Sequence, residues 1–105
     1  MRQYYQTHKQ PSTRQQKLKD KYGLTLEDYD NLLRLQNGVC AICKKPETRI
    51  QRGRITKLCV DHNHITEKNR ELLCNSCNTG LGKFKDDLLI LESAVDYLKK
   101  HLREI

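Results

Sequence analysis

The chain contains no tryptophan, one phenylalanine and one methionine among its 105 residues, so a large apolar core is not available to it. Hydrophobic residues make up 36% of the chain and charged residues 31%. Domains with so small an apolar core usually need further stabilisation by disulfides or by a bound metal. No apolar run approaches the roughly 20 residues of a membrane span, which excludes a transmembrane protein. Repeats and low-complexity tracts are also missing, and this excludes a repeat architecture.

The five cysteines are an odd number, which suits a framework made only of disulfides poorly. The first residues of the chain are polar and lack the apolar segment of a signal peptide. We therefore expect a soluble protein in a reducing cytoplasm, where paired cysteines bind metal more often than they form disulfides.

The formal net charge is +7, and it is unevenly distributed. Residues 1–21 and residues 44–57 each carry a net charge of +5, whereas the rest of the chain sums to −3. Two separated basic blocks on a small protein favour a polyanionic partner, most simply nucleic acid. A solubilising surface is the alternative, and for any single lysine it is the simpler interpretation. The candidate DNA contacts are Lys44, Lys45, Arg49, Arg52, Arg54, Lys57, Lys83 and Lys85.

The first part of the chain predicts a loose arm and two helices. Residues 1–21 form a basic block in which Pro11-Ser12 indicates the start of a helix over about 13–21. Thr25 and Asp28 then match the spacing of a capping box, which predicts a second helix to about Gln36. We expect the main domain to extend over residues 22–105.

The remaining elements are predicted from alternation and from turn residues. A basic loop over 44–54 precedes a strand over Ile55–Val60, and a return strand completes a hairpin that leads into the second cysteine pair. A short helix begins within that pair and stops by Gly80 or Gly82. The last helix, over about 86–103, has apolar residues at steps of three and four, which suits either a lid on a small core or pairing with another helix.

Two Cys-x-x-Cys pairs, separated by thirty residues, are the strongest signal in the sequence. Four thiolates at about 2.3 Å form the closed tetrahedral shell of a structural zinc site, which leaves no position for water or substrate. A redox dithiol is the weaker interpretation, because one such pair is common in redox proteins whereas two in a core-poor domain are not. The predicted ligands are Cys40, Cys43, Cys74 and Cys77. Cys59 is interpreted as a small buried hydrophobe.

An acid–histidine pair lies between the two cysteine pairs. Asp61-His62 comes at the end of a predicted strand, and Asn78 directly follows the second pair on a predicted helix. On its own such a pair is common on protein surfaces. One metal that holds strand, strand and helix together would place Asp61 and Asn78 face to face, as oxygen ligands for a hard cation such as Mg²⁺.

Several ordered motifs also carry a resemblance to a known family. They are Tyr22-Gly23-Leu24-Thr25, Asn37-Gly38-x-Cys40-x-x-Cys43, Asp61-His62-x-His64, Arg70 and Leu72-Leu73-Cys74-x-x-Cys77-Asn78. Together they resemble the recombination endonuclease VII family of His-Me finger (HNH-like) nucleases, over about residues 22–103. Glu71 and Glu67 depart from the family pattern, which usually has glycine at both positions. The resemblance therefore does not predict the local backbone conformation of the hairpin.

The resemblance implies a small zinc-stabilised α+β fold with a ββα-metal (His-Me finger) core and flanking helices. It implies that His62 is the general base, that Asp61 and Asn78 hold one Mg²⁺ or Mn²⁺, and that His64 supports the phosphate or orients the site. A surface position in the hairpin is the alternative for His64. The products would carry 3′-hydroxyl and 5′-phosphate ends, and the family would suit a phage protein in the host cell cytoplasm.

Two functions from different classes follow. The first is a metal-dependent DNA endonuclease that nicks or cleaves duplex DNA, with branched DNA such as Holliday junctions as a further substrate. The second is a non-catalytic zinc module that only binds nucleic acid, which would not need Asp61, His62 and Asn78 in that order. Junction cleavage needs two sites, so the resemblance also suggests a homodimer formed through the C-terminal helix.

Overall fold

A computed structural model of the chain describes residues 13–102. These residues belong to two compact units, one that ends at Gly38 and one that begins at Val39. The predicted arm over 1–11 and the helix start at Pro11-Ser12 lie outside the described residues. No helix among residues 13–102 is long and apolar enough to cross a bilayer.

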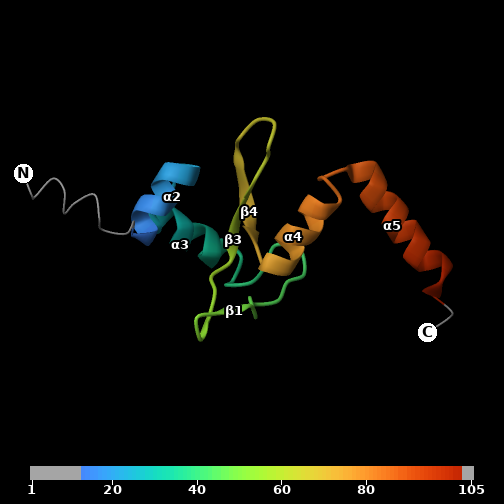
Figure 1. The fold of residues 1–105 in the computed structure, drawn as a ribbon, viewed down its shortest axis with the longest axis horizontal. Helices are drawn as coiled ribbons and strands as arrows, with labels where there is room; N and C mark the ends of the chain where they lie inside the picture. Colours follow the sequence, from blue (N-terminus) through green and yellow to red (C-terminus); the bar gives the residue numbers. More distant parts are fainter. Residues whose placement is uncertain (1–12, 103–105) are drawn as a thin grey trace, which may run out of the picture. The chain divides into compact units, whose positions relative to one another are not determined.

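The first unit contains helices α2 (Arg14–Tyr22) and α3 (Leu26–Leu35), drawn in blue and teal in Figure 1. Both begin with a capping box, since the side chains of Thr13 and Thr25 accept a hydrogen bond from the backbone three residues on. Gly23 ends α2 with a φ of 71°, a left-handed conformation in which glycine has no steric cost. Both predicted helices are therefore confirmed.

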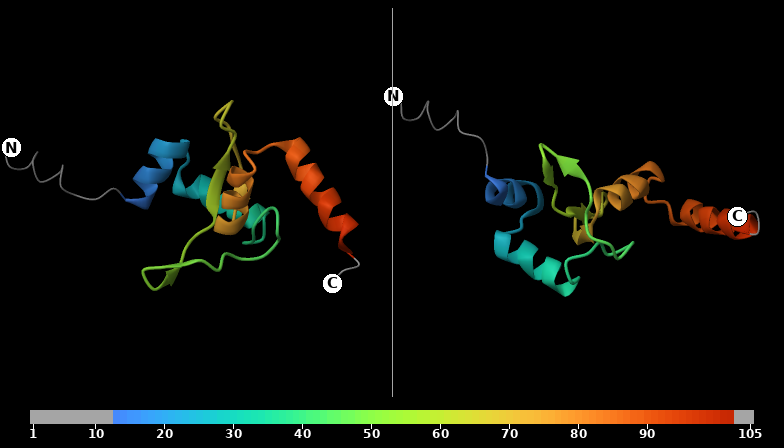
Figure 2. Two further views of the ribbon diagram at one scale, coloured as in Figure 1. Left: turned by 45° about the vertical axis from the view of Figure 1, so that its right-hand side comes forward. Right: turned by 90° about the horizontal axis from the view of Figure 1, so that it is seen from below.

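The second unit contains a two-stranded sheet of β1 (Ile50–Gln51) and β2 (Arg54–Ile55), and a second sheet of β3 (Cys59–His62) and β4 (Asn69–Leu73). Helices α4 (Asn75–Lys83) and α5 (Leu88–Lys100) follow. In both sheets the strands are antiparallel. Helix α4 packs against β3 and β4, and Figures 1 and 2 show the helix beside the hairpin. The predicted small α+β fold is confirmed.

The predicted bounds of the strand over Ile55–Val60 are wrong. Ile55 belongs to β2, which pairs with β1 across the turn Arg52-Gly53, so the strand that carries Asp61 begins only at Cys59. Arg52 and Gly53 have φ values of 56° and 77°, the left-handed pair that a tight hairpin turn requires. The basic loop over 44–54 thus contains a hairpin that the polar sequence did not indicate.

Helix α4 does not stop at Gly80 or Gly82 but continues to Lys83. Packing against the hairpin offsets the weak helix propensity of both glycines, since tertiary contacts routinely override propensity. Helix α5 is shorter than predicted. It begins at Leu88, after the N-cap residue Asp87, whose side chain accepts a hydrogen bond from the N–H of Ile90, and it ends before His101.

The core of the second unit is small and lies around the hairpin and the cysteine pairs. Its most buried members are Cys40, Leu58, Val60, Leu72, Leu73 and Cys74. Helix α5 buries none of its residues within the described part of the chain, so the prediction that it is a lid on the core is not supported. Its exposed apolar residues include Leu88, Val95 and Leu98, and Leu102, just beyond the helix, is exposed as well.

Candidate active site and metal centre

Four cysteine thiols come together in the second unit. The Sγ atoms of Cys40, Cys43, Cys74 and Cys77 all lie within 4.8 Å of one another. The Sγ atoms of Cys43 and Cys74 are 3.8 Å apart. A tetrahedral site with Zn–S bonds of about 2.3 Å has S–S edges of about 3.8 Å, so the spacing fits zinc. The structure therefore brings together all four predicted zinc ligands.

Local backbone geometry turns each thiol toward the cluster. The backbone N–H of Ile42 donates to Cys40 Sγ at 3.3 Å, and that of Cys77 donates to Cys74 Sγ at 3.4 Å. Cys74 is also the N-cap of α4, so the second pair begins the helix as predicted. The N–H of Ala41 donates to the carbonyl of Leu72 at 3.0 Å, which fastens the first pair to β4.

Ionisation of one thiol in the cluster opposes ionisation of its neighbours. Burial opposes ionisation of Cys40, yet backbone N–H groups of Cys74, Cys43 and Ile42 lower the pKa of its thiol to about 6. Burial, the thiol of Cys74 and the neighbouring Cys40 raise the pKa of Cys77. One thiolate thus forms readily and hinders the next, and a divalent cation removes this repulsion.

Cys59 stands apart from the cluster. It is half-buried on β3, opposite Leu73, and does not belong to the group of four metal-binding thiols. Burial raises the pKa of its thiol. None of the five cysteines is disulfide-bonded.

Glu47 is a site-organising residue that the sequence did not single out. Its buried carboxylate accepts hydrogen bonds from the backbone N–H groups of Thr48 (2.9 Å), Arg49 (3.0 Å) and Asn75 (2.6 Å). Burial would raise the pKa of Glu47, but these donors lower it below its usual range. The signal that could have revealed it is its position as the lone acid in a strongly basic segment.

Asp61 is buried on β3 and held by an arginine from β4. Arg70 donates from Nε to Asp61 Oδ2 at 2.5 Å and from Nη2 to Oδ1 at 3.1 Å. The same Nη2 donates to Asp86 Oδ2 at 3.0 Å. The hydrogen bond with Asp61 raises the pKa of Arg70, so the guanidinium stays charged.

An irregularity in the hairpin accounts for this pairing. Val60 lies opposite Leu72 and His62 opposite Asn69, so both Arg70 and Glu71 stand against Asp61 alone. Such a bulge re-aims side chains beside functional sites. Arg70 was noted only as part of a family motif, and its link to Asp61 needs the bulge, which the sequence does not reveal.

The histidines lie next to this carboxylate. His62 is half-buried at the end of β3, and its ring centroid is 4.5 Å from that of His64. Asn78 is half-buried in the first turn of α4, where its N–H donates to the carbonyl of Cys74 at 3.0 Å. The structure thus groups Asp61 with Arg70 and His62 with His64. The roles assigned to His62, His64 and Asn78 stay predictions.

The acidic part of the site suits a hard cation. Asp61, Arg70 and Asp86 together carry a net charge of −1. Each Asp61 oxygen accepts a hydrogen bond from Arg70 and keeps a further lone pair. Carboxylate and amide oxygens are ligands that Mg²⁺ accepts. Asp61 therefore keeps lone pairs of the kind that a divalent cation accepts, and its role as a metal ligand, with Asn78 as the second oxygen donor, stays a prediction.

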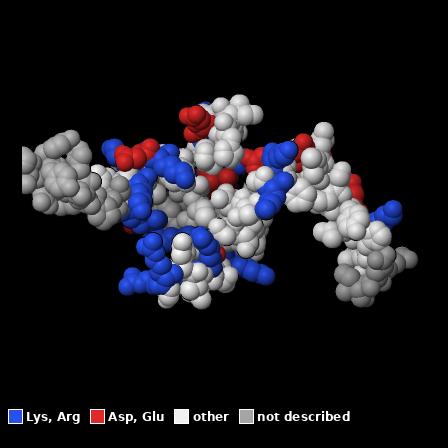
Figure 3. Space-filling view, viewed as in Figure 1, with Lys and Arg blue, Asp and Glu red and all other residues white. Residues whose placement is uncertain are grey.

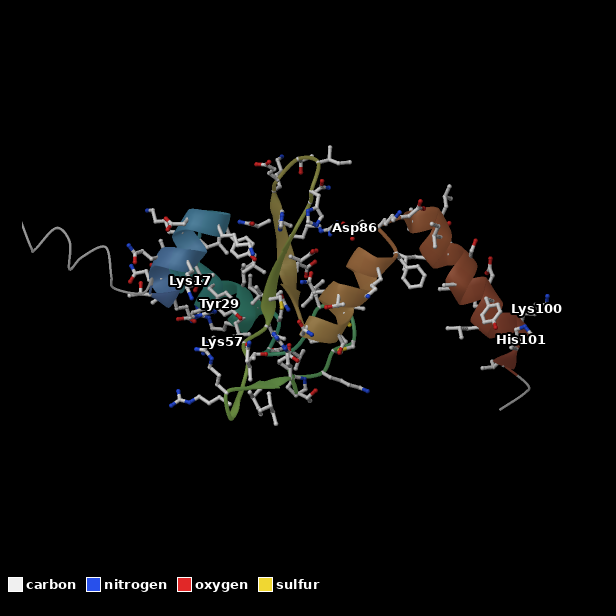
Figure 4. All side chains as sticks on the ribbon, viewed as in Figure 1. Lys17, Tyr29, Lys57, Asp86, Lys100 and His101 are labelled. Atoms are coloured by element: carbon white, nitrogen blue, oxygen red, sulfur yellow. The ribbon has the colours of Figure 1, made fainter. Side chains whose placement is uncertain are left out.

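The basic candidates are all exposed. Six of them lie between residues 44 and 57, on and around β1 and β2, and Figure 3 shows Lys and Arg side chains gathered over this hairpin. Lys83 ends α4, and Lys85 lies in the link to α5. Figure 4 labels Lys57, the last of the six basic residues between 44 and 57, just after β2. Their contact with DNA stays a prediction.

The four cysteines, which could hold a metal ion, connect the first Cys-x-x-Cys pair to the end of the β3–β4 hairpin and to α4, an arrangement that fits a small ββα protein with a structural metal. The chain belongs to the recombination endonuclease VII family, since the family model of Recombination endonuclease VII matches residues 15–100. This membership confirms the resemblance seen in the sequence.

Two phage proteins are among the relatives. The chain is 40% identical over 80 residues to the Gene 59 protein of Mycobacterium phage D29, with 75% of this chain and 46% of that protein covered. It is 36% identical over 78 residues to the Gene 59 protein of Mycobacterium phage L5, with 73% and 44% covered. The chain thus spans less than half the length of these relatives.

One solved structure is also similar, that of the beta-beta-alpha-Me type II restriction endonuclease Hpy99I. Its sequence is 37% identical, the TM-score is 0.49, and the match covers 88% of this chain and 50% of that one.

Proposed function

We propose that this chain is a zinc-braced, Mg²⁺-dependent DNA endonuclease that hydrolyses phosphodiester bonds and leaves 3′-hydroxyl and 5′-phosphate ends. The observation that carries the proposal is the buried Asp61 carboxylate, fixed by Arg70 directly before His62, in a chain of the recombination endonuclease VII family. A module that only binds nucleic acid has no need to bury a carboxylate beside a histidine.

His62 is the general base of the proposed reaction. Its neutral imidazole accepts the proton of the attacking water at neutral pH. The four-cysteine site is closed by its own ligands and so serves the fold rather than the chemistry. Asp61 and Asn78 offer oxygens to Mg²⁺ or Mn²⁺, and such an ion, when bound, stabilises the charge on the phosphate and on the leaving 3′-oxygen.

Positioning is the task of the remaining polar residues. Arg70 keeps both oxygens of Asp61 in a fixed orientation through its paired hydrogen bonds. The exposed basic residues between 44 and 57 bind the DNA backbone without reading its sequence. Glu47 connects that basic segment to the start of α4, and so to the helix that carries Asn78.

The proposal is tested with zinc-loaded protein and supercoiled plasmid, with and without Mg²⁺. We expect wild-type protein to nick or linearise the plasmid only with Mg²⁺. His62→Ala should lower the rate by about 10²–10⁴-fold, the usual contribution of a general base, with zinc content and melting temperature unchanged. His101→Ala is the matched control, because this histidine caps the end of α5 and contacts Tyr97.

Each outcome has a distinct meaning. Full activity of His62→Ala would overturn the mechanism. Wild-type protein that binds DNA but cleaves none under any metal would favour the binding module. The ratio of nicked to linear plasmid separates single-strand from double-strand cleavage.

The more specific substrate that we propose is branched DNA such as a Holliday junction. Its cleavage requires paired cuts and hence two active sites. The exposed apolar residues of α5 would supply the contact between two copies of the chain. Four-way junctions and linear duplexes of equal length, compared at equal protein concentration, distinguish this substrate from general DNA. The similarity to two phage proteins supports the host cell cytoplasm as the proposed location of this activity.

A further inference from the structure

A pocket of about 300 Å³ opens beside the end of β3. Its walls come from the segment after β3, from β4, from the end of α4 and from the link to α5. Figure 4 labels Asp86 in that link, next to the hairpin. The residues that matter for its chemistry are Asn63, His64, Arg70, Gly82, Lys85 and Asp86.

Two cationic side chains in this pocket have N–H donors that make no hydrogen bond to the described residues. Arg70 uses Nε and Nη2 for Asp61 and Asp86, while its Nη1 makes no hydrogen bond to residues 13–102. Within the same range the ammonium of Lys85 forms neither a hydrogen bond nor an ion pair. Unused donors of two cations around one cavity favour an anionic ligand.

One acid lines the pocket, and it is paired with the arginine there. Asp86 lines the cavity, and its Oδ2 accepts a hydrogen bond from Arg70. With His64 neutral, the lining residues Arg70, Lys85 and Asp86 sum to a net charge of +1, and Asp61, which also pairs with Arg70, brings the local sum to zero. The carboxylate of Asp86 thus serves to hold the guanidinium at the pocket.

The link that carries Lys85 has an unusual backbone. Lys85 and Asp86 have φ values of 56° and 54°, a left-handed conformation that is uncommon for residues other than glycine. Their N–H groups donate to the carbonyls of Gly82 and Leu81, both at 2.9 Å, and the ion pair with Arg70 adds a third restraint. Strained backbone of this kind collects at ligand sites, and here it brings Lys85 to the pocket.

Gly82 leaves room for a ligand. A Cβ atom built at this position meets nothing within 4 Å, so neither packing nor a left-handed φ requires glycine in this helix. Glycine is an unfavourable residue in a helix interior. The space beside Gly82 is therefore open to a group that is not part of the chain.

We propose that this pocket is a phosphate subsite, which binds a DNA backbone phosphate next to the scissile one through Nη1 of Arg70 and Nζ of Lys85. The contact of the His64 and His62 rings connects the pocket to the proposed general base. Arg70 then has two functions, since it positions Asp61 with one edge and binds substrate with the other. The identity of the anion as DNA rests on the proposed function, whereas the pocket and its free donors do not.

The test measures binding rather than cleavage. Zinc-loaded protein without Mg²⁺ is titrated against a fluorescein-labelled 20-base-pair duplex at several salt concentrations. Lys85→Gln should weaken binding. The slope of log K against log salt, which is negative, should become less steep by about 0.9, the value for one lost phosphate contact. Lys99→Gln, the same change on α5, should leave the slope unchanged. Arg70 is not varied, because its loss would also release Asp61.

A second pair of variants tests the pocket without altering charge. Gly82→Ala should retain wild-type affinity, whereas the larger Gly82→Leu fills the open space and should raise Kd by about tenfold, as expected for a lost charge-assisted contact. Zinc content and melting temperature show that each variant is folded. A Cβ atom at this position meets nothing within 4 Å, and leucine favours a helix.

The results separate this proposal from the nuclease proposal. If Lys85→Gln and Gly82→Leu both bind as Lys99→Gln does, the subsite is wrong even though the plasmid is cleaved. If both weaken binding but the wild-type protein cleaves nothing, the subsite stands and the nuclease fails. If the wild-type protein does not bind the duplex at all, the subsite is overturned, and plasmid cleavage alone decides the nuclease proposal.

Discussion

The carboxylate of Glu47 accepts a hydrogen bond of 2.6 Å from the backbone N–H of Asn75, at the first residue of α4. This contact joins the basic segment after the first cysteine pair to the helix after the second. The negative charge also lies at the N-terminus of a helix, where the partial positive charge of the helix dipole stabilises it. Glu47 thus reinforces the connection that a metal held by the four cysteines would make between the two pairs.

Glu47→Gln should lower the free energy of unfolding by about 1–3 kcal/mol at neutral pH, because a charge-assisted acceptor is lost from a buried position. The folded-state pKa of Glu47 is depressed, so its contribution is fully present above its ordinary pKa of about 4.5 and is lost as the pH falls below that value.

Urea denaturation of both proteins from pH 7 to pH 3 provides the measurement, with zinc content read in each sample. We expect the stability difference to be constant above pH 5 and to shrink toward acid. Glu92→Gln, on the exposed surface of α5, is the control. A difference that does not change with pH would contradict the assigned role of the carboxylate.

Removal of the metal should unfold the second unit. Cys43→Ser should reduce bound zinc from one ion per chain to almost none and abolish the cooperative thermal transition of the unit, since binding free energy of structural zinc is folding free energy. Cys59→Ala removes a thiol that is outside the cluster and should retain one zinc. Elemental analysis and calorimetry measure both effects. Loss of zinc in the Cys59 variant would show that the cluster is misassigned.

Much of the site was predictable from sequence because its signals are local. The Cys-x-x-Cys spacing predicts the two metal-binding turns, and the pair Thr25 and Asp28 predicts a helix start, since each pattern depends on residues three apart. The hydrogen bond from Asn75 to Glu47 spans 28 residues, and the ion pair of Arg70 with Asp86 spans 16. Such pairs depend on the folded chain.

The hairpin illustrates the same limit. Alternation predicted a strand before Asp61, but it could not reveal that β4 has two residues opposite Asp61. That one-residue difference decides whether Arg70 reaches the carboxylate. The two glycines of α4 led to the prediction of a helix that ends too early. The contacts that stabilise the end of this helix come from β3 and β4 rather than from its own sequence.

The basic hairpin of β1 and β2 should dominate nonspecific DNA binding. Changing Arg49, Arg52 and Arg54 to Glu should weaken binding and lower the salt slope by about 2 to 3, in proportion to the phosphates released. The measurement is fluorescence anisotropy of a labelled duplex between low and moderate salt. Changing Lys68, Lys99 and Lys100 to Glu alters the net charge equally and is the control. Equal losses in both triple variants would mean that only net charge matters.

The two glutamates that stand at family glycine positions should respond in opposite ways to glycine. Glu67 has a φ of 63°, so Glu67→Gly relieves a left-handed conformation and should maintain or raise stability, by up to about 1 kcal/mol. Glu71 lies in β4 with no such φ, so Glu71→Gly should cost about 1 kcal/mol. Chemical denaturation of each protein provides the values. Destabilisation by Glu67→Gly would show that its side chain, rather than its backbone, matters.

The apolar stripe of α5 should hold two copies of the chain together. Leu88, Leu91, Val95 and Leu98 recur at steps of three and four, and all of them except the half-buried Leu91 are exposed. The helix buries none of its residues in the described chain, which leaves the stripe for another helix. Leu91→Glu combined with Leu98→Glu should therefore convert a dimer to a monomer in light scattering. Ser93→Glu combined with Lys100→Gln changes the net charge equally on the opposite face and should remain dimeric. A monomeric wild-type protein at micromolar concentration would exclude this interface and, with it, paired cleavage of a junction by two copies joined through α5.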